Sequence, residues 1–299
     1  MRLSDLSLPD LEARLARGIG LVTGPFRFHI SSTQRRVAEG LHALYADFET
    51  GEFDFYDFHV RLARPNGIRR WLHPQIFFWL DDFSPFQPLP ADHDFAQLEW
   101  GMNWCIAGHA HHYLMLHAAV LEKNGQAVIM PGDPGAGKST LTAALSLSGW
   151  RLLSDEITLI DRDDGMIVPL ARPVSLKNTS IDLVRTFSPG ALIGEAARDT
   201  HKGTVAHLKP PTTSVMRMHE KAKAHHIVFP RWRQGSEPAS SPHSKADAFI
   251  HAASHAFNYS LLGELGFRLT SRLLDQCDCR NFEYSRLPDA LAFFEELVA

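Results

Sequence analysis

Residues 132–139 read GDPGAGKS and fit the pattern G-x-x-x-x-G-K-[ST] of a phosphate-binding loop. Glycines let successive backbone N–H groups turn inward around phosphate oxygens, because no Cβ stands in the way. In this pattern Lys138 reaches the β- and γ-phosphates of a nucleotide, and the Ser139 hydroxyl ligates Mg²⁺. The pattern therefore predicts a nucleotide site formed by Gly132, Asp133, Pro134, Gly135, Ala136, Gly137, Lys138, Ser139 and Thr140.

The residues on either side of this loop supply the strand and the helix that such a loop requires. Apolar residues 127–130 predict a strand leading into the loop, and residues 139–145 predict a helix leading out of it. The start of that helix would direct the positive end of its dipole at a bound phosphate. A glycine-rich turn without a ligand is the alternative, but such a turn does not require Lys138 and Ser139 side by side.

Two adjacent acids, Asp155 and Glu156, follow the apolar residues 151–154 shortly after the loop helix. We expect residues 151–154 to form a strand that residues 157–160 continue, which places both acids near the γ-phosphate. Phosphoryl transfer requires a metal ion and a group that accepts the hydroxyl proton of the acceptor. One acid of such an adjacent pair can ligate Mg²⁺ while the other accepts that proton. A surface turn is the alternative, because acids often end strands.

His117 and several cations could complete such a site. His117 begins the strand that should pair with residues 127–130, so we expect it beside the catalytic acids, where it would hydrogen-bond Asp155 or help to orient the acceptor. A core histidine with its hydrogen bonds satisfied is the alternative. Cations that could stabilise the transferred phosphoryl group stand at Arg172, Lys177, Lys202, Lys209, Arg231 and Arg233. We favour Lys177 and Lys202, because each lies in a segment of small residues.

Other histidines and cysteines lack the spacing of zinc ligands, and we expect no metal site among them. They form three groups, namely His109, His111, His112 and His117; His251 and His255; and Cys277 and Cys279.

Composition limits the class of protein. The 299 residues are 44% hydrophobic, which suffices for one large or two medium domains. The net charge of −4 and the scattered basic residues argue against a nucleic-acid partner. There is no long apolar run and no secretion-type leader, and three cysteines do not make a disulfide framework. We therefore expect a cytoplasmic protein without a membrane partner.

The N-terminal third predicts an aromatic-rich α+β region. Its expected elements are helices at residues 3–17 and 36–48 and strands at 26–30, 53–62, 68–72 and 76–80, with a turn at 65–67. The proline-rich residues 85–94 predict a domain boundary, so we divide the chain into residues 1–90 and 91–299.

The second region should begin with a helix over residues 93–116. Residues 117–130 then predict an antiparallel β-hairpin, because Asn124-Gly125 is a strong signal for a two-residue turn. Most doubly wound nucleotide-binding proteins would instead reach their loop through a parallel crossover. Further along, we expect strands at 224–232 and 281–287, a loop at 238–245, and helices at 181–187, 246–261, 263–274 and 288–298.

The segment around the phosphate-binding loop resembles the catalytic domain of HPr kinase/phosphorylase, a fold related to phosphoenolpyruvate carboxykinases. The match comprises His117, the hairpin, GDPGAGKST, the short helix and GWRLLSDE at residues 149–156. The sequence is closer to the HPr-kinase-related group known as "HprK-related kinase A", whose members resemble EWGMNWCI, LHAAVLEKNG, LLSDE, RPVSLKN and HKGTVAHLKPP of this chain. The core resemblance covers residues 115–162, and the wider one covers most of the chain.

The resemblance implies an α/β fold, with an HPr kinase/PEP carboxykinase-like P-loop core and mixed sheet preceded by a smaller α+β region. It also implies Asp155 as general base, Glu156 as second acid, ATP and Mg²⁺ as ligands, and self-association. Glu156 replaces an Asp of the HPr kinases, and RPVSLKN replaces their acid-and-arginine motif. Both departures argue against HPr itself as the acceptor. We expect a kinase acting on serine of a small protein or peptide, with a small-molecule kinase and a nucleotide-responsive scaffold as alternatives.

Overall fold

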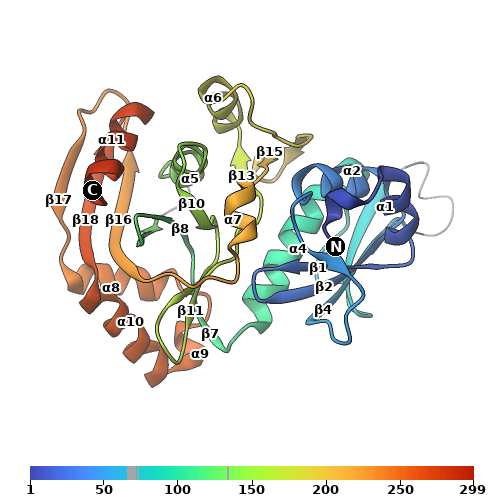
Figure 1. The fold of residues 1–299 in the computed structure, drawn as a ribbon, viewed down its shortest axis with the longest axis horizontal. Coiled ribbons are helices and arrows are strands. Elements are labelled where there is room, and N and C mark those ends of the chain that lie inside the picture. The colour runs from blue at the N-terminus through green and yellow to red at the C-terminus, as the bar shows by residue number, and fades with distance from the viewer. Residues whose placement is uncertain (66–71, 73, 133–134) are drawn as a thin grey trace.

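The computed structural model describes residues 1–65, 72, 74–132 and 135–299. The chain forms a mixed α/β fold, in which an N-terminal sheet and its helices stand beside a larger group of sheets (Figure 1). The predicted turn at residues 65–67 and strand at 68–72 lie outside the described residues, apart from Pro65 and Leu72. The same holds for Asp133 and Pro134 of the predicted nucleotide site.

The N-terminal sheet has the strand order β3-β1-β2-β4-β5-β6 and pairs β2 with β4 in parallel, while its other pairs are antiparallel. Its strands are β1 Ile19–Thr23, β2 Phe26–Ser32, β3 Thr50–Gly51, β4 Phe58–Ala63, β5 Gln75–Leu80 and β6 Leu89–Pro90. The helices that accompany it are η1 Leu3–Asp5, α1 Leu8–Leu15, α2 Arg35–Leu44, η2 Ala91–His93 and α4 Asp94–His109.

Helix α4 packs closely on this sheet. Leu98 and Met102 lie in the same hydrophobic cluster as Phe28 and Phe78 of the strands. Gly101 makes the close approach possible, because a Cβ at this position would stand 2.1 Å from an atom of the Phe78 ring. The position of α4 is therefore fixed by the N-terminal sheet, whereas a domain boundary near residue 90 stays a prediction.

The central sheet has the strand order β10-β8-β9-β16-β18-β17. Its strands are β8 Ala118–Lys123, β9 Gln126–Pro131, β10 Arg151–Ser154, β16 Ala224–Trp232, β17 Ala239–Pro242 and β18 Asp278–Tyr284. Strands β8 and β9 pair antiparallel, which confirms the predicted hairpin, and Asn124 and Gly125 both have positive φ as a tight turn requires. Strands β9, β16 and β18 run parallel to one another.

Helices cover both faces of this sheet. Alternate residues of β9 point to opposite faces, so Val128 and Met130 pack with α5 Lys138–Leu147 and α11 Leu287–Leu297, while Ile129 packs on the other side. That other side is covered by α8 Lys245–Ser254 and α10 Glu264–Gln276. Because both faces are covered, β9 is a continuous apolar run.

Two smaller sheets lie between the central sheet and the N-terminal one (Figure 1). One has the order β12-β11-β7 and the other β13-β15-β14. The remaining elements are β7 Tyr113–Leu116, β11 Thr158–Asp161, β12 Ile167–Val168, β13 Val174–Lys177, α6 Thr179–Phe187, β14 Ala197–Thr200, β15 Gly203–Leu208, α7 Thr212–Met216 and α9 Tyr259–Leu262. Of the helices in the described ranges, none is both long and apolar enough to cross a bilayer.

Several predicted elements were wrong because long-range pairing overrides the local pattern. The helix predicted over residues 93–116 ends at His109, since residues 113–116 pair with β11. The helix predicted over 246–261 breaks because the Asn258 side chain bonds the backbone of Tyr113 and Met115 in β7. Strands β1 and β17 were missed, and residues 157–160 do not continue β10 but form β11 of another sheet.

Candidate functional site

We call residues 132–139, which follow β9 and include the first two residues of α5, the glycine loop. It follows the carboxyl end of β9, at the sheet edge where the parallel strands β16 and β18 also end. The Trp232 N–H donates to the Ala136 carbonyl at 3.3 Å. Gly137 has φ of 84°, and a Cβ there would lie 2.8 Å from Tyr284 Oη. The described part of the loop is thus held against the ends of β16 and β18.

Lys138 and Ser139 are the first two residues of α5, and Thr140 follows them. Lys138 is buried, and its Nζ donates to the Gly132 carbonyl at 3.2 Å, across the mouth of the loop. The Ser139 hydroxyl donates to Asp155 Oδ2 at 3.4 Å. The two residues therefore connect the loop to the acidic pair.

Asp155 lies at the bend where the chain leaves the central sheet, and it is 5% exposed. Its Oδ2 also accepts the Ser175 N–H at 3.0 Å, whereas Oδ1 has no hydrogen-bond partner among the described residues. Burial raises the pKa of Asp155 to about 6, and the adjacent carboxylate of Glu156 acts in the same direction. The positive charge of Lys138 limits this rise.

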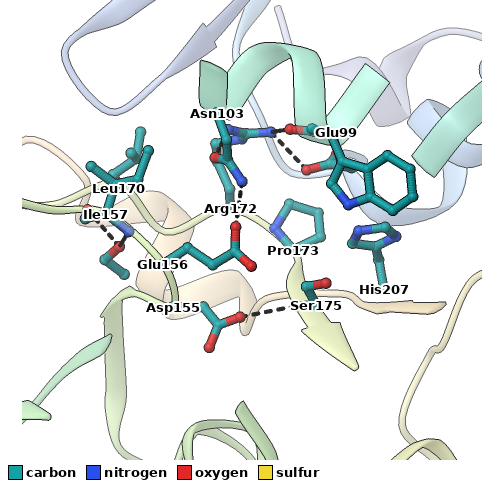
Figure 2. Close-up of a pocket in the computed structure, with 12 residues that line it drawn as sticks. Glu99, Asn103, Asp155, Glu156, Ile157, Leu170, Arg172, Pro173, Ser175 and His207 are labelled. Atoms are coloured by element: carbon teal, nitrogen blue, oxygen red, sulfur yellow. Dashed lines mark hydrogen bonds and ion pairs between the residues drawn. The ribbon is translucent and has the colours of Figure 1, made fainter. Parts of the chain in front are cut away.

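Glu156 has a different environment (Figure 2). Asn103 Nδ2 donates to its Oε2 at 2.8 Å, and Lys177 Nζ lies 3.6 Å from its Oε1. Burial acts to raise the pKa of Glu156, but the charges of Lys177 and Lys202 outweigh it and hold the pKa below the usual value. The pKa values of the two neighbouring acids are therefore shifted in opposite directions. Such a difference allows one acid to accept a proton while the other stays ionised.

His117 lies between β7 and β8, with its N–H donating to the His255 carbonyl at 2.9 Å. Burial lowers the pKa of His117 to about 4, and the charge of Lys138 acts in the same direction. The imidazole is therefore neutral at neutral pH. The charges of Lys138 and Glu156 act on its ionisation. Among the described residues its ring lies against Phe257 and makes no hydrogen bond to Asp155, so the role of His117 stays a prediction.

The predicted cations do not all face the acids. Lys177 contacts Glu156, and Lys202 Nζ lies 5.8 Å from the centre of the Trp100 ring while its charge acts on Glu156. Arg172 is instead buried against α4, where its guanidinium bonds Glu99, Asn103 and Tyr45. Arg172 lines the cavity of the two acids, but its guanidinium is occupied by these partners, and phosphate binding by Arg172 stays a prediction. The other three cations have no contact with Asp155 or Glu156 among the described residues. Lys209 pairs with Asp47, Arg233 pairs with Glu283, and Arg231 is exposed.

Sequence reasoning missed the residues around Glu156 that come from distant segments. Asn103 and Glu99 of α4, Ser175 of β13 and His207 of β15 all line one cavity with the two acids. The volume of this cavity is about 20 Å³, enough for one water molecule but far too small for a nucleotide. The spacing of Glu99 and Asn103, four residues apart on one helix face, was the signal that could have indicated them.

The arrangement brings together an ammonium, a hydroxyl, a proton acceptor and a permanent anion at the start of one helix. Such a set can bind phosphate oxygens and accept a proton. Within the described ranges, no cluster of three or more histidine, cysteine or acidic side chains could hold a metal ion by itself. A metal ion here would need oxygen ligands from a bound molecule or water as well.

Comparisons with known proteins give little. No family model matches the chain, and no curated protein matches it. One matching solved structure is the HPr(Ser) kinase/phosphatase from Coxiella burnetii, at 12% identity over 61% of this chain and 96% of that one, with a TM-score of 0.26. A likeness this weak carries no argument about fold or activity.

The raised pKa of Asp155 predicts that removing its charge stabilises the protein. Asp155→Asn keeps an oxygen for the Ser175 N–H, and it should raise the free energy of unfolding at about pH 8 by on the order of 1–3 kcal/mol. The folded-state pKa lies above the unfolded value, so the ionised wild type loses stability as the pH rises through about 6. The gain should therefore shrink as the pH falls from about 6 towards 4, as measured by urea unfolding.

Asp161→Asn is the matched control, because Lys221 lowers the pKa of Asp161 and removal of that charge should destabilise the protein at high pH. If Asp155→Asn lowered the free energy of unfolding by the same amount at about pH 8 and at about pH 4, the buried Asp155 carboxylate would not destabilise the folded protein, contrary to this prediction.

Proposed function

We propose that this protein is an ATP- and Mg²⁺-dependent kinase that transfers the γ-phosphoryl group to the serine hydroxyl of a small protein or peptide. The observation that carries this proposal is the contact between the Ser139 hydroxyl and Asp155. It links the start of the loop helix to an acid whose pKa is raised to about 6, next to an acid that stays ionised.

The residues fit a magnesium–nucleotide complex. Lys138 and the N–H groups at the start of α5 suit phosphate oxygens, and the unpartnered Oδ1 of Asp155 leaves an acceptor open among the described residues. Ser139 and Glu156 would hold Mg²⁺, which when bound neutralises charge that develops on the phosphate oxygens. Both side chains offer the hard oxygen ligands that this ion prefers.

The transfer step assigns each residue one task. The acceptor oxygen bonds to the γ-phosphorus while the bond from that phosphorus to the β–γ bridging oxygen breaks, and ADP leaves with the electron pair. Asp155 accepts the hydroxyl proton, for which a pKa near the working pH is favourable. Lys138 stabilises the negative charge on the phosphate, with Lys177 and Lys202 as further cations beside Glu156. Neutral His117 can orient the acceptor.

A free amino acid or sugar is the alternative acceptor. A kinase for an amino acid or a sugar would need a pocket that encloses its substrate beside Asp155. The cavity at the acids has room for one water molecule. The cavity as it stands holds neither such a substrate nor a serine side chain, so its size does not distinguish the two, and serine of a peptide stays the proposed acceptor.

Transfer of label from γ-labelled ATP to a protein in a cell lysate, or to neighbouring gene products, tests the proposal directly. Lys138→Ala should reduce the labelling rate by about 100-fold or more, because it removes charge stabilisation of the transferring group. Lys221→Ala, which removes a surface ion pair with Asp161 and Asp164, should leave labelling unchanged. Equal labelling by Lys138→Ala and wild type would refute the kinase.

The pH dependence tests the role of Asp155. As the pH falls below about 6, kcat/KM should drop tenfold per pH unit, because protonation removes the base in the free enzyme. Asp155→Asn should lower kcat by about 10²- to 10⁴-fold while nucleotide binding persists. An Asp155→Asn protein that binds the nucleotide but no longer transfers the phosphoryl group would also argue against a nucleotide-responsive scaffold. An Asp155→Asn protein with the wild-type kcat would exclude a general base at this position.

The glycine loop provides a test of nucleotide binding alone. Gly137→Ala combines a strained φ of 84° with a Cβ 2.8 Å from Tyr284 Oη, so the loop must shift and the affinity for ATP should fall at least about tenfold. Gly125→Ala is the matched control, since its φ of 77° carries the same strain in open space, far from the loop in the β8–β9 turn. Calorimetric titration with ATP would separate the two, and equal affinities would contradict a phosphate-binding loop.

A further inference from the structure

A chain of hydrogen bonds joins the end of α2 to the carboxylate of Glu156. The Tyr45 hydroxyl donates to Glu99 Oε1 at 2.6 Å, and Arg172 Nη2 donates to Glu99 Oε2 at 2.7 Å. Arg172 Nε also donates to the Tyr45 oxygen at 3.2 Å. Tyr45, Glu99 and Arg172 are all buried, so each charge in this group depends on the others for its partners.

Asn103 continues the chain to the site. Its Oδ1 accepts from Arg172 Nη1 at 2.6 Å, and its Nδ2 donates to Glu156 Oε2 at 2.8 Å (Figure 2). The guanidinium only donates and the carboxylate only accepts, so one orientation of the amide satisfies both. Arg172 thereby fixes the Asn103 amide, and the amide fixes one oxygen of Glu156.

The helix that carries this chain belongs to the N-terminal core. Glu99 and Asn103 stand four residues apart on α4 and share one face. The opposite side of α4 is packed on the N-terminal sheet, with Gly101 against the Phe78 ring. A displacement of α4 would therefore move both partners of Arg172 together with the group that holds Glu156.

We propose that the N-terminal region acts as a positioning element for Glu156, through Tyr45, Glu99, Arg172 and Asn103. What the positioned carboxylate then binds rests on the proposed function. Without Asn103, the remaining described contact of the carboxylate is Lys177 at 3.6 Å, a half-exposed side chain. The carboxylate would then lose the hydrogen bond that fixes its Oε2, and its orientation would depend on Lys177.

Three variants test this chain by steady-state kinetics. Asn103→Leu should lower kcat by about tenfold with the KM for ATP changed by less than about twofold, because orientation is lost while the loop is intact. Asn103→Asp keeps an acceptor for Arg172 but sets a carboxylate against Glu156, so it should lower kcat at least as much. Tyr45→Phe, which removes one hydroxyl far from the loop, should lower kcat in the same direction by about threefold.

Asp47→Asn is the control, because Asp47 links the N-terminal region to Lys209 and Thr212 without touching this chain. It should leave both constants unchanged. Thermal unfolding of every variant separates misfolding from misplacement. A kcat for Asn103→Leu equal to that of wild type would overturn the proposal.

An NMR measurement decides the inference without any enzyme activity. The side-chain amide resonances of Asn103, assigned by their loss in Asn103→Leu, should move in Glu156→Gln and in Tyr45→Phe but not in Asp47→Asn. Resonances that move in neither Glu156→Gln nor Tyr45→Phe would refute the coupling. Absence of phosphoryl transfer by the wild type would refute the proposed function instead, and the amide shifts would still report whether the N-terminal region holds Glu156.

Discussion

Two adjacent carboxyl groups at one bend of the chain, Asp155 buried and Glu156 partly buried, set the main physical constraint on this structure. Like charges in a poorly solvated place cannot both be ionised at low cost, so each acid needs partners of its own. Asp155 accepts one backbone N–H and a distant hydroxyl, and its pKa rises. Glu156 receives an amide and two ammonium charges, and its pKa falls. The opposite shifts in pKa follow from the difference in surroundings and partners.

The bend exists because the chain changes sheets at these two residues. The pairing of β10 with β8 shifts its register between Leu152 and Ser154, which marks an irregularity at the end of the strand. The Ser154 side chain then bonds both the N–H and the carbonyl of Ile157, so it closes the turn around the acids. Strand β11 continues in the sheet of β7, and the acids stay between the two sheets.

Local patterns were enough to predict the hairpin, the strand before the glycine loop and the helix after it. Each of these depends on neighbouring residues or on one strand-to-helix turn. The hydrogen bond from Asn103 to Glu156 and the pairing of Arg172 with Glu99 could not be predicted in the same way, because their partners lie 53 and 73 positions apart. The break after β10 was also unpredictable, since Ile157 and its neighbours look like any apolar strand until their pairing is known.

Arg172 illustrates how burial decides between two roles that sequence alone leaves open. An arginine near a phosphate site could bind the anion, or it could neutralise a buried acid. Withdrawing Arg172 from Glu99, which is 3% exposed, would leave an unpaired buried carboxylate and cost about 3–5 kcal/mol. A phosphate contact made at a solvent-accessible loop would have to exceed that cost before the arginine could move. Lys177 and Lys202 face Glu156 without such a commitment, so they remain the cations that can approach a bound phosphate while Arg172 holds α4 in place.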